Sequence, residues 1–118
     1  MLPYNIHHVA IAVNDLDASI ASFAEKYRLE VLSRERIEEQ GVEEAMIACG
    51  GSHIQLLQPL DAMSPVGRFL SRNGEGMHHI AFAVVDITRV RVVPGLREFR
   101  VRFAAIIPGR PGDLCVFG

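Results

Sequence analysis

The first apolar run and the polar residues after it predict a strand followed by a helix. Residues 6–13 read IHHVAIAV, a nearly continuous apolar stretch that is typical of a strand covered on both faces. An apolar stripe at helical spacing begins at Leu16 and stops before Arg28. Asn14 and Asp15 precede this stripe, and their side chains can accept hydrogen bonds from the first free backbone N–H groups of a helix.

Three β-compatible runs follow the predicted helix, at residues 30–36, 42–49 and 53–58. The turn signals EQG and GG separate them. The pattern therefore predicts a βαβββ unit over about residues 5–60. A proline-bracketed connector at about residues 61–75 carries the apolar spacing of one short helix, which Gly74 closes.

The start of the chain is repeated later in the sequence. IHHVAIAVNDL at residues 6–16 matches MHHIAFAVVDI at residues 77–87 with an offset of 71 residues. A repeat that restarts the same strand, double histidine included, predicts two copies of one supersecondary unit packed about a pseudo-twofold axis. The two repeated strands should then lie near each other.

The doubled histidines should divide between the two faces of the sheet. Successive side chains of a strand point to opposite faces. His8 and His79 can therefore face a common concavity, while His7 and His78 are expected to face away from it.

The second copy of the unit is incomplete in the sequence. After Ile87 no apolar stripe of period 3.6 follows, and Pro94 with Gly95 would break a helix. We therefore predict an α+β domain over residues 1–118, built from paired βαβββ modules of which the second, over about residues 76–118, is partial.

The amino-acid composition indicates which class of protein this is but says little about its chemistry. The chain has 118 residues, 49% of them hydrophobic, and a formal net charge of −2, which suits one globular domain. It shows no basic stripe that would indicate nucleic acid binding and no apolar run long enough to span a bilayer. Two cysteines without CxxC spacing fit a reducing environment. We expect a cytoplasmic protein without nucleic acid or membrane partners.

Two histidines on paired strands indicate a metal site. Neutral imidazole nitrogens bind divalent first-row ions well, and the repeat places His8 and His79 at equivalent positions. Gln55 lies among apolar neighbours in the run HIQLL, where a buried amide needs a hydrogen bond or a metal. Simpler readings stay open at this point: histidines also occur in protein cores, and a half-exposed strand tolerates glutamine.

Five segments taken together resemble the methylmalonyl-CoA epimerases of the vicinal-oxygen-chelate superfamily. They are HHVAIAV, EQGV, IQLLQPL, SPVGRFL and GEGMHHIAFAV, in this order and spacing over about residues 5–87. The resemblance implies paired βαβββ modules, an enzyme that is dimeric like its relatives, and an acyl-CoA substrate. It also implies that a divalent metal, whether cobalt, manganese, nickel or zinc, assists a proton transfer at C2.

The resemblance assigns roles to four residues of this chain. It implies that His8, Gln55 and His79 are metal ligands and that Glu44, just after the EQGV turn, is a catalytic base. The family has a further ligand, a glutamate of the last strand, for which this chain offers no match. Asp113 is the one acid within reach, and the role is not transferred to it. We therefore expect low activity.

Two other functions remain open from the sequence. A glyoxalase-type isomerase or a ring-cleaving dioxygenase of the same superfamily would also place two histidines on paired strands. A non-catalytic binding module, or a defective paralogue, would explain a tail that does not complete the site. The metal content of the purified protein separates these functions best.

Overall fold

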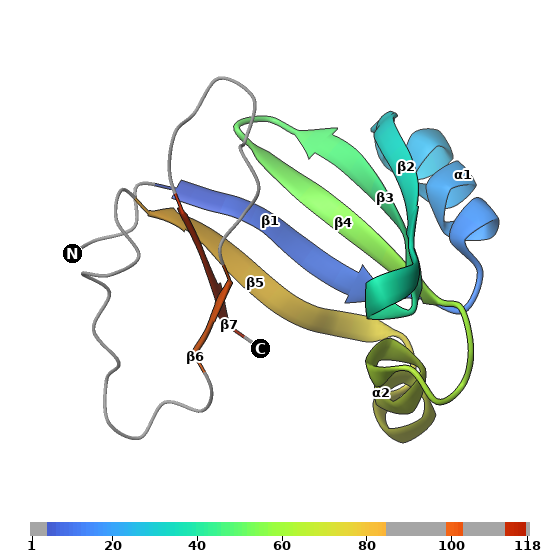
Figure 1. Cartoon of the computed structure of the whole chain (residues 1–118). Helices are drawn as coiled ribbons and strands as arrows, with labels where there is room; N and C mark the ends of the chain where they lie inside the picture. Colours follow the sequence, from blue (N-terminus) through green and yellow to red (C-terminus); the bar gives the residue numbers. More distant parts are fainter. Residues whose placement is uncertain (1–4, 85–98, 103–112, 118) are drawn as a thin grey trace.

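A computed structural model describes residues 5–84, 99–102 and 113–117, which form one mixed β-sheet with two α-helices (Figure 1). The elements in chain order are β1 (Asn5–Ala12), α1 (Leu16–Tyr27), β2 (Val31–Ile37), the 3₁₀ turn η1 (Glu38–Gln40), β3 (Val42–Cys49), β4 (Ser52–Pro59), α2 (Pro65–Asn73), β5 (Gly76–Val84), β6 (Phe99–Arg102) and β7 (Asp113–Phe117). The strand order is β2-β3-β4-β1-β5-β7-β6. The predicted α+β class, the first βαβββ unit and the short connector helix are confirmed. The expected helix break at Pro94 lies outside the described residues.

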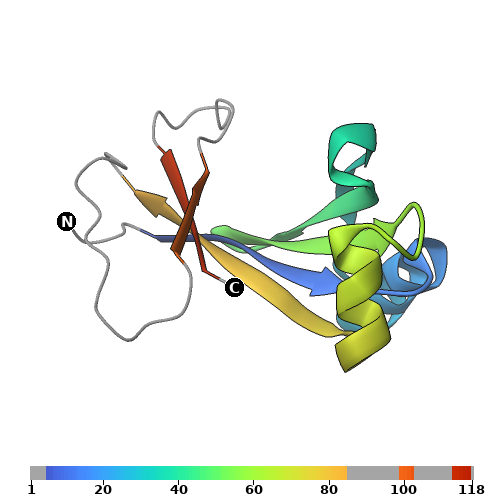
Figure 2. The same ribbon diagram turned by 60° about the horizontal axis from the view of Figure 1, so that its bottom comes forward.

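The two α-helices cover different faces of the sheet, as the two views of the ribbon show (Figures 1 and 2). One core cluster lies under α1 and contains Val13, Leu16, Ala45, Ile47 and Leu56. The other lies under α2 and contains Ala10, Ala12, Val42, Leu57 and Val66. Alternate residues of β1, β3 and β4 therefore supply both cores, which explains why these strands read as continuous apolar runs.

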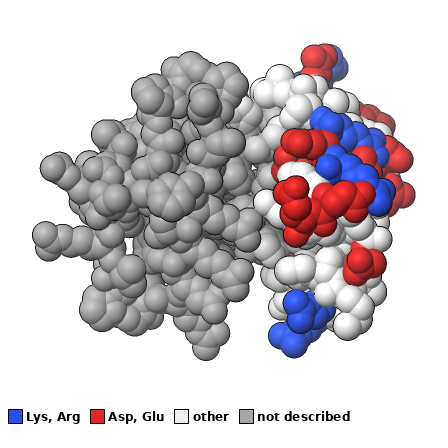
Figure 3. Space-filling model, in the orientation of Figure 1, with Lys and Arg blue, Asp and Glu red and all other residues white. Residues whose placement is uncertain are grey.

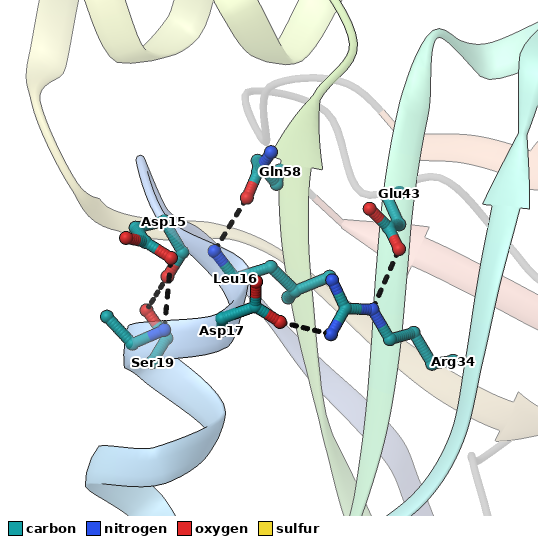
Figure 4. Close-up of polar contacts among 8 residues, drawn as sticks. Asp15, Leu16, Asp17, Ser19, Arg34, Glu43 and Gln58 are labelled. Atoms are coloured by element: carbon teal, nitrogen blue, oxygen red, sulfur yellow. Dashed lines mark hydrogen bonds and ion pairs between the residues drawn. The ribbon is translucent and has the colours of Figure 1, made fainter.

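Local signals set the limits of α1 as the sequence predicts. The Asp15 side chain accepts a hydrogen bond from the backbone N–H of Ala18 at 3.0 Å, which caps the first turn. Arg28 adopts the left-handed conformation with φ 57° and ends the helix. The Gln58 side chain on β4 accepts a hydrogen bond from the backbone N–H of Leu16 at 2.6 Å, so the start of α1 is fixed to the sheet (Figure 4).

Arg34 ties the outer strand β2 to both of its neighbours. Its guanidinium donates to Glu43 on β3 at 2.7 Å and also contacts Asp17 on α1 (Figure 4). Arg36 pairs with Glu38 in the adjoining turn. In Figure 3, acidic and basic side chains intermingle on the described side of the molecule, and no basic stripe is seen there. Within the described residues no helix is long and apolar enough to cross a membrane.

The EQGV turn packs tightly against the connector before α2. Gly41 has φ 67°, a conformation that favours glycine, and a Cβ atom at this position would approach the Ser64 Cβ to 2.8 Å. The backbone N–H of Leu60 donates to the Gly41 carbonyl at 2.8 Å. The turn is therefore held in place, and with it the beginning of β3.

The two halves of the sheet meet at the repeated strands, as predicted. β1 and β5 pair antiparallel at the centre of the sheet. In the first half the three-stranded meander β2-β3-β4 returns parallel to β1. In the described second half β6 and β7 pair with each other, and β7 runs antiparallel to β5. The last strand of the first half, β4, thus runs parallel to β1, whereas the last described strand, β7, runs antiparallel to β5.

Candidate functional site

Three of the four predicted site residues lie on the central strands, on one face of the sheet. Gln55 on β4 is opposite Ala10 on β1, and Ala10 is opposite His79 on β5. Residues directly opposite each other on paired strands share a face, and so do residues two positions apart on one strand. His8 therefore lies on the same face as Gln55 and His79. This is the face that α2 covers, because Ala10 belongs to the α2 core cluster.

Glu44 comes to the same face from β3. Met46 is opposite Gln55, and Glu44 lies two residues before Met46. Its neighbour Glu43 lies on the α1 face in the ion pair with Arg34. The alternation that the sequence predicts for this pair of glutamates is therefore seen.

The predicted ligands His8 and His79 are in direct contact. Their Nε2 atoms lie 3.1 Å apart, and their ring centroids 5.2 Å apart in an edge-to-face arrangement. His8 is only 6% exposed. Burial, and then the neighbouring histidine rings, lowers the pKa of His8 to about 3, so this ring is neutral near pH 7. A neutral imidazole offers a lone pair to a metal ion.

Gln55 and Glu44 form the second contact of the site. The Gln55 Nε2 donates to the Glu44 carboxylate. Because an ionised carboxylate only accepts, the amide must present its nitrogen to Glu44. The Gln55 Oε1 is buried and has no hydrogen-bond partner among the described residues. Burial raises the pKa of Glu44, while the hydrogen bond from Gln55 acts against this shift.

These donor atoms fit a divalent cation. Two imidazole nitrogens converge, and within the described part of the chain the buried Gln55 amide oxygen lacks the hydrogen-bond partner that such a group ordinarily has. β4 and β5 are two strand spacings apart, a gap of roughly 10 Å. Long side chains that extend from both strands can bridge this gap. In the described part of the chain no group of three or more His, Cys, Asp or Glu is arranged to hold a metal. The candidate ligands are thus two histidine nitrogens and one amide oxygen.

The predicted orientation of the first histidine in each pair is wrong. The His7 ring is in contact with His8, with the two Nδ1 atoms 2.7 Å apart, and the His78 ring is in contact with His79 in the same way at 2.8 Å. The reason is that the pairing of β1 with β5 skips one residue at each place, between Ile6 and His8 and at His78. Such β-bulges re-aim side chains and interrupt the regular alternation.

The bulges bring together histidines that sequence reasoning left out of the site. The His53 ring centroid lies 5.2 Å from that of His7, and the His53 Nδ1 donates to the His7 backbone carbonyl at 3.2 Å. Phe69 of α2 contacts His78, with 5.0 Å between the ring centroids. All five histidines of the chain thus belong to one cluster. The doubling of histidine in both copies of the repeat was the signal for it.

The backbone register also identifies the β7 residue that corresponds to Gln55 in the repeat. Gln55 lies opposite Ala10, whose repeat mate is Ala81, and Ala81 pairs with Val116 on β7. Val116 is therefore the β7 residue at the register position that corresponds to Gln55, although β7 runs antiparallel to β5 whereas β4 runs parallel to β1. Valine has no metal-binding atom. Asp113, the first residue of β7, has a different register position.

Comparisons with known proteins identify the fold family. The model of the glyoxalase/bleomycin resistance protein/dioxygenase superfamily matches residues 7–115. An ethylmalonyl-CoA/methylmalonyl-CoA epimerase of Cereibacter sphaeroides is 38% identical over 87 residues, which are 73% of this chain and 65% of that protein. The human mitochondrial methylmalonyl-CoA epimerase is 34% identical over 98 residues, which are 82% of this chain and 54% of that protein.

Solved structures of epimerases match the fold as well. A methylmalonyl-CoA epimerase in complex with methylmalonyl-CoA and NH4+ has a TM-score of 0.71 and 37% identity, covering 88% of this chain and 80% of that one. A Streptomyces coelicolor methylmalonyl-CoA epimerase variant in complex with 2-nitronate-propionyl-CoA gives 0.69 and 36%, covering 88% and 82%. The resemblance to epimerases seen in the motifs is confirmed. The chain spans between 55% and 65% of the length of the first curated relatives that it matches.

Proposed function

Since the chain belongs to the glyoxalase/bleomycin resistance protein/dioxygenase superfamily, we propose that it interconverts the two C2 epimers of methylmalonyl-CoA. The observation that carries the proposal is the paired contact of Glu44 with Gln55 on the face that holds His8 and His79. It brings a carboxylate base next to a candidate ligand. Relatives that are named methylmalonyl-CoA epimerases support the choice of substrate.

His8, Gln55 and His79 would hold the divalent cation. When bound, it would supply positive charge to the oxygens of the substrate as the C2 proton leaves. His8 and His79 would contribute imidazole nitrogens, and Gln55 would contribute its Oε1, which has no hydrogen-bond partner among the described residues. The donor set suits cobalt, manganese, nickel or zinc.

Glu44 would remove the proton from C2 on one side of the substrate. A base works best when its pKa lies near the operating pH, and burial raises the pKa of Glu44 in that direction. The hydrogen bond from Gln55 holds the carboxylate in one orientation and favours its ionised, proton-accepting form.

Inversion at C2 requires a second base on the other side of the substrate. The register position equivalent to Gln55 belongs to Val116, which cannot accept a proton. Glu44 can therefore exchange the C2 proton of one epimer with solvent, while return of a proton to the opposite side relies on water. We propose an enzyme that exchanges the C2 proton faster than it inverts the centre.

The test measures both processes on the same sample. The 118-residue chain is incubated with methylmalonyl-CoA in D2O with added Co²⁺ or Mn²⁺; mass spectrometry follows deuterium at C2, and an enantioselective assay follows inversion. Deuterium uptake that depends on the metal and exceeds inversion supports the proposal. Absence of uptake in protein that retains stoichiometric metal would refute epimerase chemistry.

A non-catalytic binding module is the second candidate, and one observation favours it: the β7 residue paired with Ala81 is Val116, which has no ligand atom. Purified protein without stoichiometric metal, and without exchange when metal is added, would support this function. A glyoxalase-type isomerase or a dioxygenase would retain metal but leave methylmalonyl-CoA unchanged.

The proposed partners are an acyl-CoA substrate and a second copy of the chain. Strands β2 and β6 end the described sheet on its two sides, and a strand at a sheet edge presents unpaired backbone groups. A homodimer would cover such an edge. Light scattering of the purified protein measures the oligomeric state directly.

A further inference from the structure

Two histidines outside the proposed ligand set, His7 and His78, make the same contact at both ends of the His8–His79 pair. The Nδ1 atoms of His7 and His8 lie 2.7 Å apart, and those of His78 and His79 lie 2.8 Å apart. The 3.1 Å approach of the His8 and His79 Nε2 atoms joins the two pairs. Four rings from two strands therefore form one continuous chain of nitrogen contacts.

Neutral imidazole chemistry restricts where the protons of this chain lie. A neutral ring carries one N–H donor and one bare acceptor nitrogen. His8 uses both nitrogens, one toward His7 and one toward His79. His79 likewise uses both, toward His8 and toward His78. When both rings are neutral, each must donate in one contact and accept in the other, so the three hydrogen bonds run in a single direction.

Metal binding requires a different arrangement. A nitrogen that binds a metal carries no proton, so the Nε2 atoms of both His8 and His79 must be bare. Each ligand ring then carries its proton on Nδ1 and donates it outward. His7 and His78 must then both accept at Nδ1. Compared with the metal-free arrangement, the hydrogen bond at one end of the four rings therefore changes its direction.

We propose that His7 and His78 are positioning residues of the metal site, each accepting the Nδ1–H of the adjacent ligand and so keeping that ligand's Nε2 bare. The inference rests on the proposed function, because it takes His8 and His79 as ligands. Ligand histidines in metalloproteins usually donate their second N–H to a carboxylate, a backbone carbonyl or water. An imidazole differs from these carboxylate and carbonyl partners because it can change from donor to acceptor by changing tautomer.

The fold provides the geometry for this role at both places. In a regular strand the first histidine of each pair would lie on the opposite face from its ligand neighbour. The bulges of the β1–β5 pairing bring both histidines of each pair to one side. Phe69 contacts the His78 ring, and His53 contacts the His7 ring, so both positioning rings are packed from outside the chain of four.

The first experiment reads the tautomers directly. Long-range ¹H–¹⁵N correlation spectra of the imidazole rings are recorded at slightly alkaline pH, without metal and with Zn²⁺, and assigned with single His→Asn variants. With zinc we expect His8 and His79 as Nδ1–H tautomers, and His7 and His78 as Nε2–H tautomers. An Nδ1–H tautomer at His7 or His78 in the zinc-loaded protein would overturn the inference.

The metal-free spectrum separates failure of this inference from failure of the proposed function. If zinc does not bind, the proposed metal site is wrong. In the metal-free protein the three hydrogen bonds should nevertheless run in one direction. Only one of His7 and His78 then carries its proton on Nδ1 in any one molecule, so the fractional Nδ1–H populations of the two rings should sum to one. Donors at both ends would contradict the hydrogen-bond chain itself, whatever the metal does.

Variants supply a second readout by isothermal titration with Zn²⁺. His7→Leu and His78→Leu remove the acceptor at similar size and should weaken binding by about 10- to 100-fold, the effect expected for a partner of a ligand. His7→Asn and His78→Asn keep an acceptor near the Nδ1 position and should restore binding to within a few-fold. His53→Leu tests packing separately, because His53 contacts the His7 ring and bonds the His7 backbone but bonds no ligand ring. Equal losses in the Leu and Asn variants would show that packing, not hydrogen bonding, is the role of these rings.

Discussion

The two halves of the sheet begin with nearly the same strand and continue differently. β1 leads through α1 into a three-stranded meander that returns parallel to it and brings Gln55 beside Ala10. β5 is followed, among the described strands, by β6 and β7, and β7 runs antiparallel to it with Val116 at the equivalent place. The first half thus carries Gln55 and Glu44, the candidate ligand and base, whereas the candidate residue in the described part of the second half is His79. A repeated first strand is therefore enough to bring His8 and His79 together, and the other candidate residues depend on the strands that follow.

The largest effect is expected where the two halves contribute equally. His8→Ala and His79→Ala each remove one of two converging nitrogens, and each should abolish metal retention because an isolated imidazole with one amide binds weakly. Metal content after gel filtration, measured by mass spectrometry, tests both variants. If His8→Ala retains metal as tightly as the parent chain, the site assignment is wrong.

Glu44→Gln tests whether the base comes from the first half alone. Removing a general base typically costs about 10²- to 10⁴-fold in rate, so the variant should keep its metal and lose most C2 exchange. The deuterium-uptake assay gives the rate, and metal analysis of the same sample is the control. Loss of metal, with normal exchange in the fraction that remains loaded, would assign Glu44 to the ligand set instead.

Leu56→Ala tests how much stability resides in the complete half. Leu56 is fully buried under α1, and truncating a buried leucine costs about 2 to 5 kcal/mol through lost transfer energy and the cavity left behind. Urea unfolding followed by circular dichroism measures the free energy of unfolding. Leu32→Ala on the outer strand, where the side chain is 61% exposed, is the control and should change it little.

Val116→Glu should make the second half more like the first. A carboxylate at this register position would add a ligand and a base, so we expect metal affinity to rise by about 10-fold or more and inversion to approach the rate of exchange. Val116→Gln is the matched variant: it adds a ligand without a base, so affinity should rise while inversion stays slow. If neither variant changes affinity, the register position does not face the site.

The smallest effect concerns the start of α1, an element that the described second half lacks. Asp15→Ala removes the side-chain acceptor for the Ala18 N–H and should destabilise the fold by about 1 kcal/mol. Thermal unfolding measures the change, and Asp15→Asn should retain most of the stability because it keeps an acceptor. A loss in Asp15→Asn equal to that in Asp15→Ala would indicate that charge, and not capping, is the contribution.

Local sequence by itself determined the elements of the first half, their caps and the repeat. The helix between Asp15 and Arg28 is set by interactions between residues close in sequence. The same holds for Glu43 and Glu44, whose side chains point to opposite faces because they are adjacent on one strand. The family resemblance and the pairing of His8 with His79 were likewise legible, because an offset of 71 residues repeats the same motif.

Only the tertiary structure decided where the remaining histidines and the last strand lie. A β-bulge depends on how two strands pair, so no single strand's sequence reports that His7 and His78 join their neighbours. The register of β7 on β5 likewise placed Val116, and not Asp113, opposite Ala81. Side-chain alternation is a property of one strand, but bulges and register are properties of a pair.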